Sequence, residues 1–346
     1  MKYFILLPFL FVLCGCQGHD SDIDSEDHKP MVSEICVAPT RTMAAFIVSQ
    51  KPPQRPFDIK IWTLDLNSGA VAPTTLETSL GFTPFSWSPD ASVLAYKSHD
   101  ESSIRLFDLR SLSESVVSAS APSKAVDNRP RFNTVHFSPT GKYLGYLSGN
   151  TLRIHNFAAR QSMDAVHAIE SDNWCWLANG EEILFNKDAR LHRMNVSSGK
   201  SEVVYSPKLD SKDDFQFPYL TLSPDPDSIG FYAGKTFYAL DLNNKSADPL
   251  FTCDHWFTEF DWRESGIVYL DAANGNRRKR ARLMVFDPST KTSREIAVGP
   301  FAFASWAQGD TIIARSGRSQ IVLIDGRTGA SRLLFDAQAG TSNTKP

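Results

Sequence analysis

The sequence predicts an all-β protein, a seven-bladed β-propeller whose blades are four-stranded antiparallel sheets. Three observations support this fold class. A short apolar strand, a tight polar turn and a second apolar strand follow one another seven times along the chain, and the copies are 39 to 50 residues apart. Each interval can also be divided into four strands. A period of about 40 to 50 residues with several strand signals is typical of propellers.

The first strand of each repeat has the same three-residue pattern. Its copies lie at 35–37, 85–87, 135–137, 174–176, 220–222, 260–262 and 304–306. The third residue is large and apolar, and it is expected to pack each blade on its neighbour. These residues are Val37, Trp87, Phe137, Trp176, Leu222, Trp262 and Trp306. The middle residue is mostly small, as expected where wedge-shaped blades converge on an axis. These residues are Cys36, Ser86, His136, Cys175, Thr221, Asp261 and Ser305.

The second repeat shows the remaining elements best. Its strands are predicted at 84–87, 93–97, 104–109 and 114–118, because apolar residues alternate there between turn residues. The third strand of several repeats ends in a cluster of Asp, Asn and Gly, which supplies the backbone conformations that hairpins require. Such clusters lie at 65–69, 195–199, 241–244 and 325–329.

The chain is predicted to divide into four segments. Residues 1–15 have a charged start and a short apolar run, which is typical of a signal peptide. Residues 16–32 are acidic and almost without aliphatic residues, so they are expected to form a flexible tether. Residues 33–336 form the propeller, and residues 337–346 form a disordered tail.

The residues 13–16, Leu-Cys-Gly-Cys, resemble the lipobox of bacterial lipoproteins. The resemblance implies that Cys16 is lipidated and becomes the first residue of the mature protein. Gln17 stands where an aspartate would resemble an inner-membrane retention signal. The resemblance therefore implies an outer-membrane lipoprotein that faces the periplasm. A plain secretory signal is the alternative.

The charge of the chain lies in its first segment. The net charge of −3 at pH 7 is the sum over residues 1–30, so the rest of the chain is neutral overall. Nucleic-acid-binding proteins show a basic surface instead, and no nucleic-acid partner is predicted. Cys36, Cys175 and Cys253 are expected to pack as small apolar residues without a disulfide, because Cys36 and Cys175 belong to separate blades.

The turns at 87–90 and 137–141, Trp-Ser-Pro-Asp and Phe-Ser-Pro-Thr-Gly, resemble the repeats of the TolB-like (WD40-like) β-propeller family. The resemblance covers about residues 33 to 336 and weakens in the later repeats. The chain departs from TolB itself, which has six blades behind an extra α/β domain. The same repeats occur in prolyl-oligopeptidase-type peptidases and in oligogalacturonate lyases. The former would need a hydrolase domain, for which the sequence leaves no residues.

One rim of the propeller is predicted to carry the long loops and to be the binding face. The loops lie at 49–58, 75–83, 120–134, 206–218 and 271–282. Basic residues of three consecutive blades gather on this face and are predicted to contact a partner. They are Lys51, Arg55, Arg277, Arg278, Lys279, Arg280, Arg282, Arg315 and Arg318. Charges that serve only solubility are the alternative.

The sequence gives no sign of catalytic chemistry. It contains no Gly-x-Ser-x-Gly motif, no zinc-ligand spacing and no phosphate-binding glycine loop, so no catalytic residue, metal or cofactor is predicted. The predicted function is a lipid-anchored, monomeric, non-enzymatic scaffold that binds a protein partner of the cell envelope through its long-loop face. The alternative is a carbohydrate-active or metal-dependent enzyme, similar to oligogalacturonate lyases, that uses Cys36, His136, Cys175 and Asp261 beside the axis.

Overall fold

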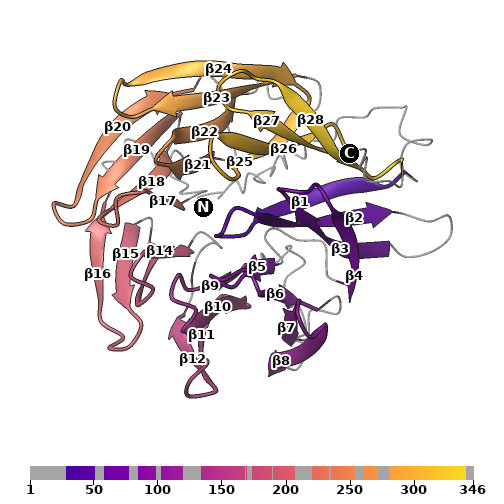
Figure 1. Cartoon of the computed structure of the whole chain (residues 1–346). Helices are drawn as coiled ribbons and strands as arrows, with labels where there is room; N and C mark the ends of the chain where they lie inside the picture. The colour runs from indigo at the N-terminus through magenta and orange to yellow at the C-terminus, as the bar shows by residue number, and fades with distance from the viewer. Residues whose placement is uncertain are drawn as a thin grey trace, which may run out of the picture.

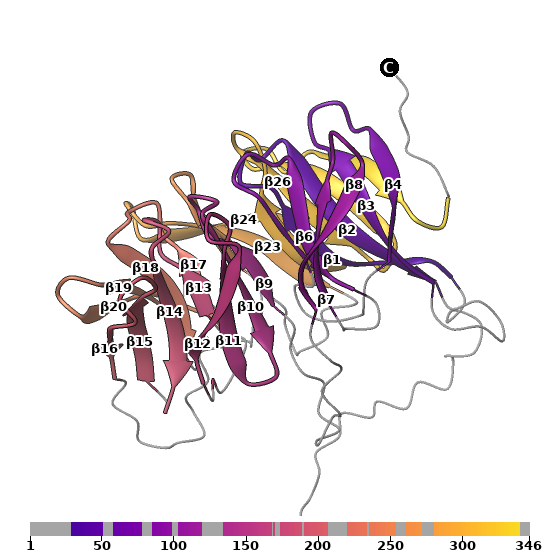
Figure 2. The ribbon, with the colours of Figure 1, turned by 90° about the horizontal axis from the view of Figure 1, so that it is seen from below.

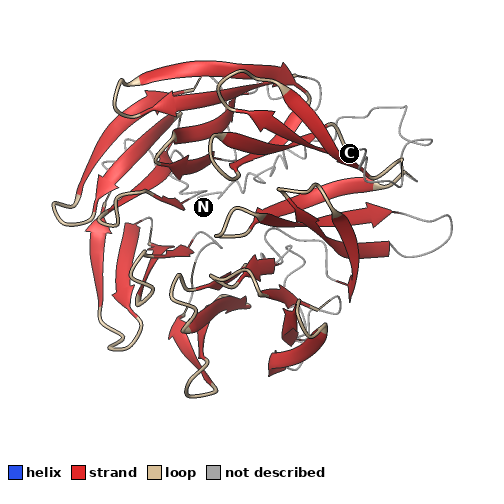
Figure 3. Cartoon of the chain, in the orientation of Figure 1, coloured by secondary structure: helices blue, strands red, loops and turns tan. Residues whose placement is uncertain are grey.

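The computed structural model describes residues 29–50, 58–77, 85–98, 103–119, 134–167, 169, 174–188, 190–206, 220–233, 235–253, 260–271 and 280–339. Over these ranges twenty-eight strands form seven four-stranded antiparallel sheets. The sheets are arranged as blades in a ring (Figure 1), and the described elements are all strands (Figure 3). The predicted fold class is confirmed. The described residues contain no helix that is long and apolar enough to cross a membrane.

Each blade uses four consecutive strands. Blades 1 and 2 are β1 (Met31–Val37), β2 (Met43–Gln50), β3 (Asp58–Asp65), β4 (Val71–Glu77), and β5 (Phe85–Trp87), β6 (Val93–Lys97), β7 (Ser103–Asp108), β8 (Ser113–Ala119). Blades 3 and 4 are β9 (Val135–Phe137), β10 (Tyr143–Ser148), β11 (Thr151–Asn156), β12 (Gln161–Val166), and β13 (Trp174–Trp176), β14 (Glu182–Lys187), β15 (Arg190–Asn195), β16 (Ser201–Tyr205). Blades 5 and 6 are β17 (Leu220–Leu222), β18 (Ser228–Ala233), β19 (Thr236–Asp241), β20 (Ser246–Thr252), and β21 (Phe260–Arg263), β22 (Gly266–Asp271), β23 (Ala281–Asp287), β24 (Thr292–Gly299). Blade 7 is β25 (Phe301–Trp306), β26 (Thr311–Ser316), β27 (Gln320–Asp325), β28 (Ser331–Asp336).

The strands of blade 2 agree with the predicted ranges to within about one residue at each end. A feature that the sequence pattern did not predict recurs in all seven blades: the pairing of the third and fourth strands shifts register near the start of the third. Such a β-bulge increases the local twist of a sheet. In Figure 2, the ring turned by 90°, the strands of the labelled blades run between the same two rims.

The core is a set of seven apolar clusters, one between each pair of adjacent blades. Six of the seven third residues of the innermost strands belong to these clusters or pack against them, as predicted, and the exception is Leu222. Trp87, Trp176, Trp262 and Trp306 are buried, whereas Val37, Phe137 and Leu222 are half-buried. Three of the tryptophans also donate an indole hydrogen bond of 3.0 Å to a backbone carbonyl of the preceding blade, at Cys36, His136 and Gly266.

The ring closes between blades 7 and 1 without exchanging a strand. The order β1-β2-β3-β4 and the order β25-β26-β27-β28 are separate sheets, so the two ends of the described chain do not share a blade. Closure rests on an apolar cluster that joins Val32 and Phe46 of blade 1 to Phe335 of blade 7. The backbone N–H of Val32 also donates to the carbonyl of Arg318 at 2.7 Å. Side-chain contacts therefore hold blades 7 and 1 together, where a shared sheet would do so through backbone hydrogen bonds.

Replacing Trp176 by phenylalanine should lower the free energy of unfolding by about 2 kcal/mol, because it removes buried volume and leaves the carbonyl of His136 without its indole donor. Urea unfolding followed by far-ultraviolet circular dichroism would measure this. Trp62→Phe is the matched control, since Trp62 is half-buried and stacks on Phe46. If Trp62→Phe lowered the free energy of unfolding as much as Trp176→Phe does, the assigned role of the Trp176 indole hydrogen bond would be contradicted.

Candidate functional site

The innermost strands surround the centre of the ring (Figure 1). The middle residue of each strand supplies one side chain to this inner layer. These side chains are Cys36, Ser86, His136, Cys175, Thr221, Asp261 and Ser305. Ser305 is 9% exposed, and the other six are partly buried. The seven positions therefore form the candidate site, which we call the axial ring.

Several members of the axial ring contact the next blade. The Ser86 hydroxyl accepts a hydrogen bond of 3.1 Å from the backbone N–H of Phe137. Asp261 Oδ2 accepts one of 3.0 Å from the backbone N–H of Trp306. The His136 ring packs edge-on against Trp174, with 4.9 Å between ring centroids. The small size of these residues is thus explained by the narrow space between converging blades, as the sequence suggested.

Burial keeps three titratable groups of the axial ring uncharged, those of His136, Cys36 and Cys175. It lowers the pKa of His136 to about 4 and raises the pKa of the Cys36 and Cys175 thiols to about 12. The imidazole is therefore neutral and both thiols are protonated near pH 7. Among the described residues, no group of three or more His, Cys, Asp or Glu side chains could hold a metal ion. The axial metal site of the alternative prediction thus has no support in the described part of the chain.

Asp261, the acidic member of the axial ring, is the centre of a polar network. It accepts hydrogen bonds from the Ser305 hydroxyl at 2.6 Å and from Arg41 Nη1 at 3.0 Å. Arg263 Nε lies 3.2 Å from its other carboxylate oxygen. The sequence prediction missed Arg41, which belongs to blade 1 and is 220 residues from Asp261. The signal was present, since Arg41 occupies the turn position where aligned repeats have Gly141 and Gly180.

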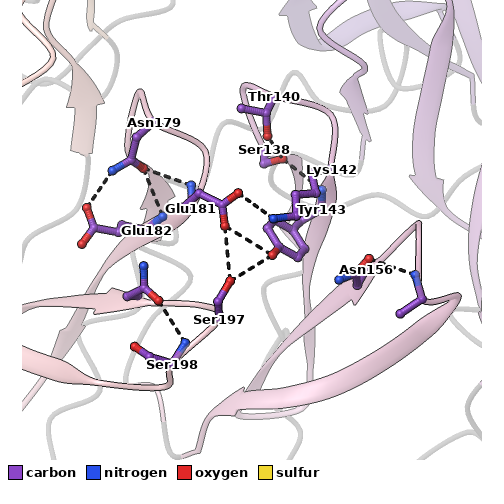
Figure 4. A network of polar contacts seen from close by, with 12 residues as sticks. Ser138, Thr140, Lys142, Tyr143, Asn156, Asn179, Glu181, Glu182, Ser197 and Ser198 are labelled. Atoms are coloured by element: carbon purple, nitrogen blue, oxygen red, sulfur yellow. Dashed lines mark hydrogen bonds and ion pairs between the residues drawn. The ribbon is translucent and has the colours of Figure 1, made fainter.

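A second network joins blades 3 and 4 at the rim that carries the turns between first and second strands (Figure 4). Lys142 Nζ lies 2.7 Å from Glu181 Oε1, and the Tyr143 hydroxyl lies 3.3 Å from Glu181 Oε2 and 3.2 Å from Ser197 Oγ. The side chains of Lys142 and Glu181 are 44% and 35% exposed. Exposed ion pairs contribute about 1 kcal/mol or less, so this network aligns neighbouring blades more than it stabilises them.

The basic residues predicted to contact a partner do not form one described cluster. Arg282 is ion-paired with Asp271, and Arg315 Nη1 donates to the carbonyl of Val32 at 2.9 Å. Arg318 is exposed and accepts the backbone hydrogen bond of Val32, while Arg280 is exposed. The Arg315 side chain and the Arg318 backbone carbonyl therefore contact blade 1 at the seam. Lys51, Arg55, Arg277, Arg278, Lys279 and Cys16 lie outside the described residues, as does most of each predicted long loop.

No protein-family model matches the chain, and no characterised protein matches its sequence. Solved structures do match its fold. The β-propeller domain of the Trilobed protease from Pyrococcus furiosus, described as having an open velcro topology, is 13% identical with a TM-score of 0.63. The match covers 92% of this chain and 99% of that domain. In this chain, too, the two ends of the described residues belong to separate blades.

Two whole peptidases match in the same way. A puromycin-hydrolyzing peptidase of Mycobacterium tuberculosis is 13% identical with a TM-score of 0.65, and the match covers 93% of this chain and 56% of the peptidase. An acylaminoacyl peptidase of Pyrococcus horikoshii is 12% identical with a TM-score of 0.65. The match covers 91% of this chain and 54% of that peptidase. The chain thus spans about half the length of these two peptidases. At such identities the likeness establishes the fold.

These matches contradict the prediction of a non-enzymatic scaffold that binds an envelope protein through its long-loop face. Propellers of peptidases resemble this chain over about nine-tenths of its length, so the fold gives no support to a non-enzymatic scaffold. The prediction failed because the repeat defines the shape of the ring and says nothing of its chemistry. The argument from a missing hydrolase domain does not bear on the match, which covers 56% and 54% of the two whole peptidases.

The low pKa of His136 makes stability depend on pH. Its pKa is about 4 in the folded chain and near 6.5 in an unfolded one, so the folded state binds fewer protons between these values. The free energy of unfolding should therefore fall as the pH drops from 6.5 to 4, by up to about 3 kcal/mol. His136→Gln should remove this part of the pH dependence in urea titrations, and His155→Gln a smaller part. An unchanged slope in His136→Gln would contradict the assignment.

Proposed function

We propose that this chain is the peptide-handling propeller of a peptidase. It receives a peptide segment beside the ring axis and presents it to a hydrolytic site outside the described residues. The observation that carries the proposal is the match with peptidase propellers, which covers 99% of one such domain but 53–56% of the whole peptidases.

The chemistry of the axial ring fits a peptide better than a polyanion. Ser86 and Thr221 offer hydroxyl groups, and His136 offers a neutral imidazole, all of them partly buried. The carboxylate of Asp261 is already matched by Arg41 and Arg263. Uncharged groups that donate and accept hydrogen bonds suit a polypeptide backbone, which carries one donor and one acceptor per residue.

We also propose that the propeller belongs to the TolB-like repeat class and acts as a lipoprotein of the bacterial outer membrane, facing the periplasm. The turn motifs at 87–90 and 137–141 and the lipobox-like residues 13–16 support these two assignments. Its partners would then be the membrane, through the lipid on Cys16, and the protein part that supplies the hydrolytic site. We expect the propeller to be monomeric.

Peptide binding tests the proposal directly. The purified protein should bind fluorescein-labelled, N-acetylated octapeptides saturably, as measured by fluorescence anisotropy. Thr221→Arg should weaken binding about tenfold or more, because a long charged side chain would fill the axial ring. Val116→Arg is the matched control, since Val116 lies on the outer strand β8 and is 58% exposed. Equal binding by the two variants would exclude the axial ring as the site.

The lipid anchor is tested separately. In a bacterial host, the wild-type chain should be labelled by an azide-bearing palmitate analogue and sediment with membranes, whereas Cys16→Ser should lose both properties. Lipidation of the cysteine after a signal sequence is the step that this substitution removes. A Cys16→Ser protein that still carries the label would contradict the assignment of Cys16.

A further inference from the structure

The turn after the first strand of blade 1 holds an arginine in an unfavourable backbone conformation. In blades 1 to 4 the equivalent turn residue has a left-handed backbone, and its N–H donates to the carbonyl three residues earlier at 2.8–2.9 Å. These residues are Arg41, Ala91, Gly141 and Gly180, with φ between 57° and 71°. Glycine suits this conformation, and a residue with a long side chain adopts it only when other contacts compensate.

The compensating contacts of Arg41 join three blades. Its Nη1 atom donates to the carbonyl of Trp306 at 2.8 Å and to the Ser305 hydroxyl at 3.3 Å, both in blade 7. The same atom lies 3.0 Å from Asp261 Oδ2 in blade 6. The side chains of Arg41 and Asp261 are 15% and 14% exposed, so water screens the pair weakly. We call Arg41, Asp261, Ser305 and Trp306 the clasp.

The clasp lies where the ring lacks a shared sheet. Blade 1 is held at the start of β1 by the backbone hydrogen bond from Val32 to Arg318 and by the bond from Arg315 to Val32. Arg41 follows the other end of β1. The innermost strand of the last blade, β25, contains both Ser305 and Trp306. The seam between blades 7 and 1 is therefore held by polar contacts near both ends of β1, with the apolar cluster between them.

Asp261 has other partners besides Arg41. Without Arg41, Asp261 keeps the Ser305 hydroxyl at 2.6 Å, the backbone N–H of Trp306 at 3.0 Å and Arg263 Nε at 3.2 Å. Opening the clasp therefore leaves no unpaired carboxylate, and the guanidinium is free to be hydrated. An ion pair whose acid remains satisfied can break at a much lower cost than one that leaves a buried charge unpaired.

We propose that the clasp is a reversible closure of the propeller, and that Arg41 sets how often the seam between blades 7 and 1 opens. Hydration of the guanidinium favours the open state, and the contacts to blades 6 and 7 favour the closed state. One consequence rests on the proposed function: a peptide would reach the axial ring more quickly when the clasp is open. The closure itself does not depend on peptide handling.

Hydrogen exchange measured by mass spectrometry on the full chain tests the clasp. Arg41→Gly removes the guanidinium and installs the residue that this turn prefers, so the turn itself still forms. The exchange rate of the Val32 amide, which spans the seam, should rise about ten- to a hundredfold, the range expected for losing a hydrogen bond to a charged group. Amides of β10 and β11 in blade 3 should keep their rates.

Ala91→Gly is the matched control, because it makes the same substitution in the same turn of blade 2 and leaves the clasp intact. Asp261→Asn is a second variant that keeps an oxygen acceptor for Trp306 and removes the ion pair. It should raise the Val32 exchange rate by a smaller factor. Equal Val32 rates in Arg41→Gly, Ala91→Gly and the wild type would overturn the clasp.

Peptide association kinetics separate the clasp from the proposed function. A faster association of the acetylated octapeptide in Arg41→Gly, together with faster Val32 exchange, would support both. Faster exchange with an unchanged association rate would uphold the clasp and overturn its role in peptide access. Faster exchange in a protein that binds no octapeptide would uphold the clasp and overturn the proposed function.

Discussion

Every blade of this propeller depends on its neighbours for the burial of its apolar faces. A twisted four-stranded sheet cannot cover its own faces, so the core is divided into seven clusters that each belong to two blades. This constraint explains the tryptophans of the innermost strands, whose indole groups bond to the preceding blade. It also makes the last interface special. The chain must bring residues near its two described ends together, and only side chains and one backbone hydrogen bond between Val32 and Arg318 do so there.

Much of the fold could be predicted because it repeats. The strand pattern of residues 85–97 appears in several copies, and each copy supports the others. Contacts that occur once could not be predicted in this way. Arg41 stands out in the sequence because aligned repeats have glycine there, but nothing in the sequence identifies Asp261, 220 residues away, as its partner. The same limit applies to Arg282, Arg315 and Arg318, whose predicted contact with a partner stays a prediction. In the structure Arg282 pairs with Asp271, Arg315 donates to the Val32 carbonyl, and the Arg318 carbonyl accepts from the Val32 N–H.

The axial ring shows how packing and chemistry are linked in a narrow space. The blades converge so closely that most middle positions hold small residues, and the larger His136 is accommodated with its ring against Trp174. The burial that results keeps His136, Cys36 and Cys175 neutral. A peptide brought to this place would meet hydrogen-bonding groups without meeting strong charges. The function was harder to predict than the fold, because the repeat determines the shape of the ring and does not determine what the ring binds.

The register shift between the third and fourth strands affects how this molecule meets other molecules. A propeller exposes one free strand edge per blade, and a flat edge is a template onto which another chain can add a strand. Here each outer strand is interrupted in its pairing near one end, as at Ile104 and Arg105 in blade 2. The added twist shortens the straight edge that an incoming strand could follow. The protein can thus have seven open strand edges and still show little tendency to assemble with other copies of itself into fibres.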